Sequence, residues 1–311
     1  MRKRTPFLVL VLIVAPFFQR GQTALVFANA TISSVSLTTG SDVITTSVDP
    51  EVTYKFKFNV FDPDSLDDLN NIVVKIYYEA STMDDIRSCY TFTWTEGAGS
   101  TPFVSSPLDY VVTSSVIPTA EEELLSSFDF ELHFNLDGVA VPSGSSTTWN
   151  VDVTVTDDSA ATDSNTETVF DVTKYQAFTV STSSIAFGTA VPGATLTKQQ
   201  VTVTLTTNTQ VDINVQGGDL TYSSYSIPAD QFNAWDDSAE FPTSYTLSTS
   251  DTTVYDDYVT VADAINSGVT GYTDAGDLLV GFDGTVPSVQ AVGSYTATWR
   301  ISIDQSGVNA N

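Results

Sequence analysis

Cysteine and histidine are almost absent from this chain of 311 residues. Cys89 is the only cysteine, so the chain cannot form an internal disulfide and has no second thiol for a redox pair. His133 is the only histidine, and it falls on the polar face of a strand predicted over residues 128–136. A histidine metal cluster is therefore excluded, and a histidine-based catalytic triad is out of reach.

Long hydrophobic runs are also missing, apart from one near the start of the chain. Basic residues 2–4 precede an apolar run over residues 7–18, and Ala28-Asn29-Ala30 follows it. This order is typical of a secretory signal peptide, and the run is too short to span a bilayer comfortably. We expect residues 1–30 to be a signal peptide cut after Ala30. Cleavage after Ala24 and retention of the signal as an anchor are the alternatives, and the mature chain is expected to have no membrane span.

Lysine and arginine are scarce as well, numbering 11 against 38 acidic residues. Four of the basic residues lie in the predicted signal, so the mature chain keeps seven, which gives a formal net charge of −31. Such a surface repels phosphate backbones and anionic lipid headgroups, which argues against nucleic acid and membrane surfaces as partners. Cations, basic surfaces and a high-salt environment suit this charge better.

Helix signals are confined to one short segment, in which Thr119 and Glu122 have the spacing of a capping box. Elsewhere apolar and polar residues alternate with period two, which predicts strands with one buried face. The clearest predicted inward faces comprise residues 52, 54, 56, 58 and 60; 72, 74, 76 and 78; 90, 92 and 94; and 149, 151, 153 and 155. Helix-rich folds are therefore excluded.

The strand pattern predicts an all-β chain with two consecutive Ig-like β-sandwich domains after the signal peptide. Residues 31–175 hold six or seven predicted strands, the number of an Ig-like sandwich. Residues 176–311 form a second and less regular sandwich, in which the alternation from Tyr295 to Ile303 indicates a last, central strand and residues 261–266 a short helix. The arrangement of residues 219–291 stays open.

Two segments resemble known modules. FNVFDPDSLDDLNNIVVKIYY, residues 58–78, is similar to the strand, acidic loop and strand of many secreted Ig-like and fibronectin type III-like modules. SSIAFGTAVPGATLTKQQVTVTL, residues 183–205, resembles the opening of Ig-like repeats that begin with IxFGxxxxG. The resemblance covers under a fifth of the chain. It implies a surface or extracellular module and supplies no catalytic residue.

Aspartates in two loops of the first domain are candidate calcium ligands. Loops between the second and third strands, and between the last two, emerge at the same end of an Ig-type sandwich. Oxygen-rich clusters suit calcium, which would offset the repulsion of the carboxylates. The alternative is that these aspartates cap turns by bonding to their own backbone. The candidate ligands are Asp62, Asp64, Asp67, Asp68, Asp157, Asp158 and Asp163.

Trp235, Asp236 and Asp237 form a weaker candidate site. Trp235 has a loop-like context, in contrast to the other three tryptophans, which share apolar strand faces. It could stack on a sugar ring, or two carboxylates beside it could hydrolyse a glycan. The alternative is a tryptophan that anchors a loop.

These features predict an exported, non-enzymatic structural or interaction protein of the cell surface or of an extracellular fibre or layer. Its expected partners are copies of itself or other surface proteins. Residues 31–39 could add as a strand to the sheet of a neighbour, or form the first strand of their own domain. A carbohydrate-binding adhesin and a secreted glycoside hydrolase are the two alternatives, with a glycan as ligand.

Overall fold

A computed structural model describes residues 29–79, 87–97, 103–143, 148–237, 243–258 and 277–305. The described chain is nearly all β, and its helical residues are the two 3-10 turns η1 (Leu66–Asp68) and η2 (Ala229–Gln231). The all-β prediction is confirmed. Residues 1–28 of the predicted signal peptide and the helix predicted over 261–266 lie outside the described residues. The described residues include no helix with the length and apolar character needed to cross a membrane.

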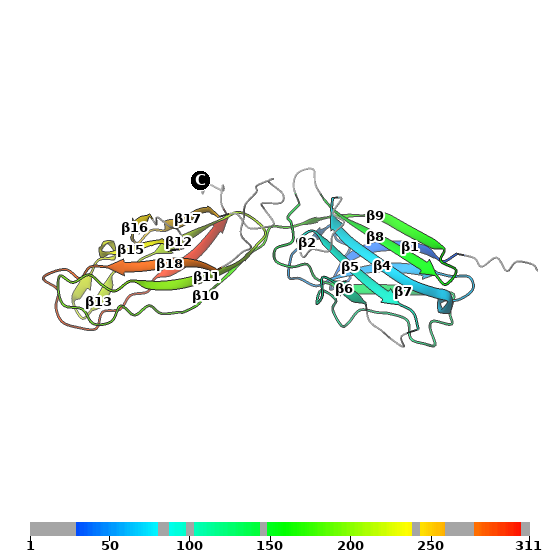
Figure 1. Ribbon diagram of the computed structural model, residues 1–311, viewed down its shortest axis with the longest axis horizontal. Helices are drawn as coiled ribbons and strands as arrows, with labels where there is room; N and C mark the ends of the chain where they lie inside the picture. Colours follow the sequence, from blue (N-terminus) through cyan, green and yellow to red (C-terminus); the bar gives the residue numbers. More distant parts are fainter. Residues whose placement is uncertain are drawn as a thin grey trace, which may run out of the picture.

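Two sheets build the first lobe, drawn from blue to green in Figure 1. One is a three-stranded antiparallel sheet of β1 (Thr31–Thr39), β3 (Tyr54–Phe61) and β7 (Ser127–Phe134), in that order. The other has the order β2-β9-β8-β4-β5-β6, and only its β2–β9 pair is parallel. Its strands are β2 (Ser47–Val48), β9 (Thr162–Val172), β8 (Trp149–Asp157), β4 (Leu69–Tyr78), β5 (Cys89–Thr95) and β6 (Val104–Ser106).

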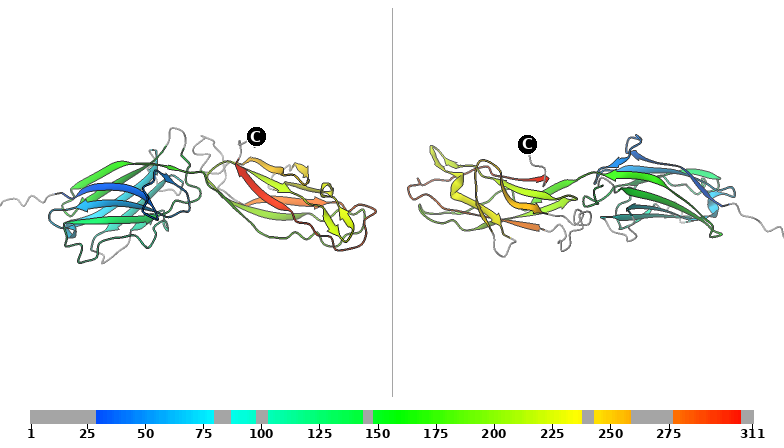
Figure 2. Two further views of the ribbon diagram at one scale, coloured as in Figure 1. Left: turned by 180° about the vertical axis from the view of Figure 1, so that it is seen from behind. Right: turned by 90° about the horizontal axis from the view of Figure 1, so that it is seen from above.

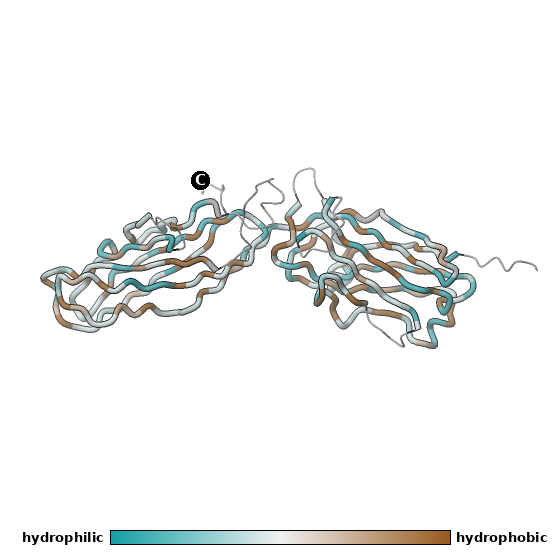
Figure 3. The backbone as a smooth tube through the Cα atoms, viewed as in Figure 1, coloured by the Kyte–Doolittle hydropathy of each residue, from teal (hydrophilic) through white to brown (hydrophobic). Residues whose placement is uncertain are grey.

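The period-two pattern decides which side chains of these strands are buried. Burial alternates residue by residue through β3 and β8, and apolar and polar residues alternate along the strands in Figure 3. Aromatic rings from the two sheets meet in the core, where Trp94 lies 5.4 Å from Phe130 and Phe92 lies 5.9 Å from Phe134 between ring centroids. The two sheets therefore pack face to face as a sandwich.

The described residues of the second lobe form three sheets, with the orders β10-β11-β18-β15-β16, β17-β12-β19 and β13-β14. Its core residues form a hydrophobic cluster separate from that of the first lobe. The strands are β10 (Gln176–Val180), β11 (Gln199–Thr207), β12 (Val211–Gln216), β13 (Leu220–Tyr222), β14 (Tyr225–Ile227), β15 (Phe232–Asp236), β16 (Ser244–Thr246), β17 (Thr252–Tyr258), β18 (Asp277–Gly284) and β19 (Arg300–Gln305).

The last strand differs from its prediction. It begins at Arg300 and lies at the edge of the three-stranded sheet, in which β12 is central. The alternation before it reflects packing of a non-strand segment, since Trp299 inserts between Phe232 and Phe282 at centroid distances of 5.2 and 5.6 Å. In this segment the apolar alternation therefore marks half-buried side chains, Tyr295 and Trp299, that pack on the core without a continuous ladder of hydrogen bonds.

The two lobes lie end to end and meet at the segment that enters β10 (Figures 1 and 2). Asn208, in the β11–β12 turn, is fully buried there. Its side chain donates to the carbonyl oxygens of Ala140 and Thr173 of the first lobe, both at 2.9 Å, and accepts from the Tyr175 amide at 2.6 Å. Tyr175 also packs on Gly138, where a Cβ atom would lie 2.8 Å from the ring.

Candidate metal centre

Eight carboxylates lie at one end of the first lobe, in four connections of the chain. We call this end the acidic pole. Its members are Asp62, Asp64, Asp67, Asp68, Glu96, Glu123, Asp157 and Asp158.

Strand register brings these connections together. Leu69 at the start of β4 pairs with Asp157 at the end of β8, and Asn71 pairs with Thr95 near the end of β5. The β3–β4 and β8–β9 loops consequently meet, and the Asp158 amide donates to the Asp68 carbonyl oxygen at 2.8 Å. The sequence predicted this meeting of the two loops for an Ig-type sandwich.

At this pole, the last inward-facing position at the end of three strands, β3, β5 and β8, is occupied by an acidic residue. Asp62 follows Phe58 and Val60 of β3, Glu96 follows Trp94 of β5, and Asp157 ends β8. Asp62 is only 1% exposed, Asp157 is buried and Glu96 is half-buried. The alternation that fills the core thus also directs carboxylates inward at its rim.

A turn before β7 supplies the remaining acid, Glu123. Thr119 and Glu122 form the predicted capping box, with the Thr119 amide donating to Glu122 Oε2 at 2.9 Å. The segment makes one turn rather than a regular helix, with Glu123 N donating to Thr119 O at 2.9 Å. Hydrogen bonds from Asp62 N to Ser126 O and from Leu66 N to Leu125 O fix the turn against the β3–β4 loop.

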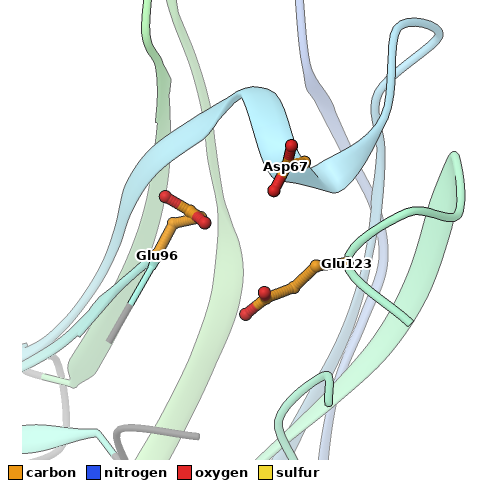
Figure 4. Close-up of side chains that lie close together, drawn as sticks. All are labelled: Asp67, Glu96 and Glu123. Atoms are coloured by element: carbon orange, nitrogen blue, oxygen red, sulfur yellow. The ribbon is translucent and has the colours of Figure 1, made fainter. Parts of the chain in front are cut away.

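Asp67, Glu96 and Glu123 form the tightest group at the pole. Carboxylate oxygens from all three lie within 4.8 Å of one another, and Figure 4 shows them converging from η1, the end of β5 and the turn before β7. Asp67 is exposed, Glu96 half-buried and Glu123 only 7% exposed. Such a set of hard oxygen donors has the chemistry to bind a hard divalent cation.

The electrostatics of the pole oppose ionisation. Burial, followed by the charges of Glu123, Asp67 and Asp158, raises the pKa of the Glu96 carboxyl above its ordinary value. Burial also raises the pKa of Asp68, with further contributions from its acidic neighbours, Asp62 foremost. Ionisation of Glu96 and Asp68 therefore costs more free energy in the folded state than in water.

The predicted calcium ligands have different environments: one belongs to the group of Asp67, Glu96 and Glu123, and several others accept hydrogen bonds from the backbone. Only Asp67 belongs to the tight group. Asp62 Oδ1 accepts from the Asp64 amide at 2.9 Å, and Asp157 Oδ1 accepts from Ser159 Oγ at 2.7 Å and the Ala161 amide at 2.8 Å, as the turn-capping alternative predicts. Asp163 accepts from the Ile32 amide of β1 at 2.9 Å.

Sequence reasoning missed Glu96 and Glu123. Glu96 carried a signal, since it occupies the next inward position after Tyr90, Phe92 and Trp94. An acid in phase with an apolar series at a strand end points into the rim of the core. Glu123 carried a weaker signal, because it is reached only through contacts between the two sheets.

The second candidate site is built differently from its prediction. Trp235 is a buried residue of β15, so the predicted loop context is wrong. Its ring lies against Gly281 of β18, and Lys198 Nζ lies 4.8 Å from the ring centroid. Asp237 accepts from Trp235 Nε1 at 2.9 Å and also bonds Lys198 and Gln200. Asp236 ends β15. These contacts give Trp235 and Asp237 a packing role in the second lobe.

Residues 31–39 were predicted either to add as a strand to the sheet of a neighbour or to form the first strand of their own domain. In the structure they form β1 of their own domain. Residues of β1 pair with β3 from Thr31–Phe61 to Thr39–Tyr54, with an irregularity between Ser33 and Ser36.

No protein-family model matches the chain, and no curated protein does. Among solved structures, the chain is similar to the CsuC–CsuE chaperone–tip adhesion subunit complex of the archaic chaperone-usher Csu pili of Acinetobacter baumannii, with 12% identity and a TM-score of 0.35 over 87% of this chain and 99% of that one. It is also similar to BcpA, the major pilin subunit of Bacillus cereus, with 11% identity and a TM-score of 0.26 over 83% of this chain. The match spans 56% of the BcpA chain. At these identities the function has to be argued from the residues of this chain.

Proposed function

We propose that the chain is an exported, non-enzymatic subunit of a cell-surface fibre or layer, which acts as a stiff, soluble building block. The observation that carries this proposal is the joint between the lobes. The fully buried side chain of Asn208, in the second lobe, bonds backbone groups of the first lobe and of the segment that enters β10, and the two sandwiches lie end to end as one elongated unit (Figure 1). A fixed long axis is what a repeating extracellular assembly needs from its subunit.

The composition supports the same function. The signal peptide predicted from the sequence would direct the chain out of the cytoplasm, and the strongly acidic composition opposes nonspecific aggregation. Specific contacts with further copies or with other surface proteins would build the assembly, with sheet edges available for strand addition.

Electron microscopy of the purified chain tests this function. We expect filaments or ordered layers at rising protein concentration, and the same structures on the surface of cells that export the chain. Monodisperse particles at every concentration, together with no ordered structure on such cells, would contradict the proposal.

Two further assays address the alternatives. Specific binding on a glycan array would favour the adhesin, and release of reducing sugars from a panel of polysaccharides would favour the hydrolase. We expect neither.

A further inference from the structure

The group of Asp67, Glu96 and Glu123 has a property that a solvated acidic patch does not share. Glu123 is 7% exposed, and its carboxylate points into the group (Figure 4). Within the described residues, this carboxylate takes part in no hydrogen bond or ion pair. Burying an ionised carboxylate is costly unless it is paired or coordinates a metal.

Another carboxylate at the same pole has a fully buried oxygen. Asp62 is 1% exposed, and its Oδ2 atom has no hydrogen-bond partner among the described residues. Elsewhere in the lobe, acids receive basic partners, since Lys57 Nζ lies 2.8 Å from both Asp42 Oδ1 and Glu131 Oε1. Asp67, Glu96 and Glu123 have no such basic partner in the ion pairs of the described residues.

We propose that Asp67, Glu96 and Glu123 bind a calcium ion that joins the two sheets of the first lobe at the acidic pole. Three carboxylates offer six oxygens, and calcium takes about 6–8 oxygen ligands in flexible geometry. The group contains no nitrogen or sulfur ligand, which disfavours zinc and copper. Magnesium demands a stricter octahedron and dehydrates reluctantly, so three carboxylates from separate connections suit it less well.

The position of the group gives the ion a structural role. Asp67 lies between β3 and β4, which belong to different sheets, whereas Glu96 follows β5 and Glu123 precedes β7. A cation bound to all three would connect both sheets where the strands end. It would also offset the mutual repulsion of the carboxylates that surround Glu96.

Isothermal titration calorimetry of the purified, chelator-treated chain with calcium chloride tests the proposal. We expect one site with a Kd of about 10⁻⁴–10⁻³ M, the range of extracellular calcium modules, and weaker binding of magnesium chloride. The melting temperature should rise with calcium concentration, because an ion that binds only the folded state stabilises it.

Single variants locate the site. Glu123→Gln and Asp67→Asn should each weaken calcium binding at least about tenfold, in line with the loss of a ligand. Glu121→Gln removes the same charge from an exposed position in the same turn and should leave the Kd within about twofold, because the residue lies outside the group. Asp67 is exposed, so its variant tests the site even if Glu123→Gln does not fold.

Three results would overturn the proposal. These are no calcium heat and an unchanged melting temperature, an unchanged Kd in the Asp67→Asn variant, and a preference for magnesium.

Discussion

Asn208 Nδ2 donates to the Ala140 carbonyl oxygen at 2.9 Å, and this hydrogen bond joins the turn between β11 and β12 to the first lobe. The same nitrogen donates to Thr173 O, and Oδ1 accepts from the Tyr175 amide. One fully buried side chain of the second lobe thus satisfies backbone groups of the first lobe and of the segment that enters β10. Buried polar groups that lose their partner cost about 1–3 kcal/mol each, so the joint has a defined geometry.

Asn208→Ala should therefore loosen the joint. We expect the free energy of unfolding to fall by about 1–3 kcal/mol, because the variant leaves buried backbone groups without a partner. The radius of gyration from small-angle X-ray scattering should change as the lobes bend relative to each other. Asn70→Ala, at an exposed position of β4, is the control and should preserve both values. A wild-type scattering curve for Asn208→Ala would show that the joint does not depend on this side chain.

The sequence predicts the strands well because burial alternates with the same period as the residues. Phe56, Phe58 and Trp94 are buried as the pattern indicates, since each lies on an inward face. It fails at Trp235, which was predicted in a loop and lies in β15, whereas at Trp299 it predicts the apolar packing but wrongly assigns a strand. Trp235 lies against Gly281, and Trp299 packs on Phe187 and Phe232, contacts that only the tertiary fold creates.

The acidic pole shows the same division. The meeting of the β3–β4 and β8–β9 loops follows from sandwich topology, so the sequence predicts Asp68 and Asp158 near each other. The inward direction of Asp62 and Asp157 can also be predicted, because each lies two residues beyond the last apolar inward-facing residue of its strand. Glu123 could not be predicted, because its position depends on a turn bonded to the β3–β4 loop through Leu125 and Ser126.

The pH dependence of the chelator-treated chain should report the acidic pole. Burial and like charges raise the folded-state pKa of Glu96 and of Asp68 above their unfolded values. The folded state then holds these protons more tightly than the unfolded state, so stability falls as the pH rises from the unfolded pKa, about 4, through the folded pKa. The groups that face these two carboxyls are Asp62, Asp64, Asp67, Glu123 and Asp158.

Melting temperatures measured from pH 4 to pH 7 check this sign. We expect a decrease with rising pH in chelator and a smaller decrease, or an increase, in calcium, which binds the ionised carboxylates. Glu96→Gln should flatten the profile in chelator. The account would be contradicted if, in chelator, the melting temperature rose with pH and did so by the same amount in the wild type and in Glu96→Gln.

Asp163 should control how firmly β1 is held. Its carboxylate accepts from the Ile32 amide at 2.9 Å, beside the irregular part of the β1–β3 pairing. Asp163→Ala should weaken this end of β1 by about 1 kcal/mol, and amide hydrogen exchange over residues 31–33 should quicken. Asp171→Ala, at an exposed position of the same strand β9, should leave that exchange unchanged. If β1 can be lent to a neighbour, Asp163→Ala should also change the rate at which filaments form.

Asp42 should stay ionised far into the acid range. Hydrogen bonds from Lys55, followed by those from Lys57, lower the pKa of Asp42 to about 2, and each Nζ atom lies 2.8 Å from Oδ1. Its stabilising contribution is complete above the unfolded pKa and is lost as the pH falls through about 2. A carboxyl-carbon NMR titration should give this pKa directly. Asp42→Asn keeps a residue type that tolerates the positive φ of 65° and should lower the urea midpoint at pH 7 but not below pH 2. Asp256→Asn, at an exposed carboxylate of β17, is the control and should change neither the urea midpoint nor the pKa of Asp42. An Asp42 pKa near its ordinary value would show that Lys55 and Lys57 do not stabilise the ionised carboxylate.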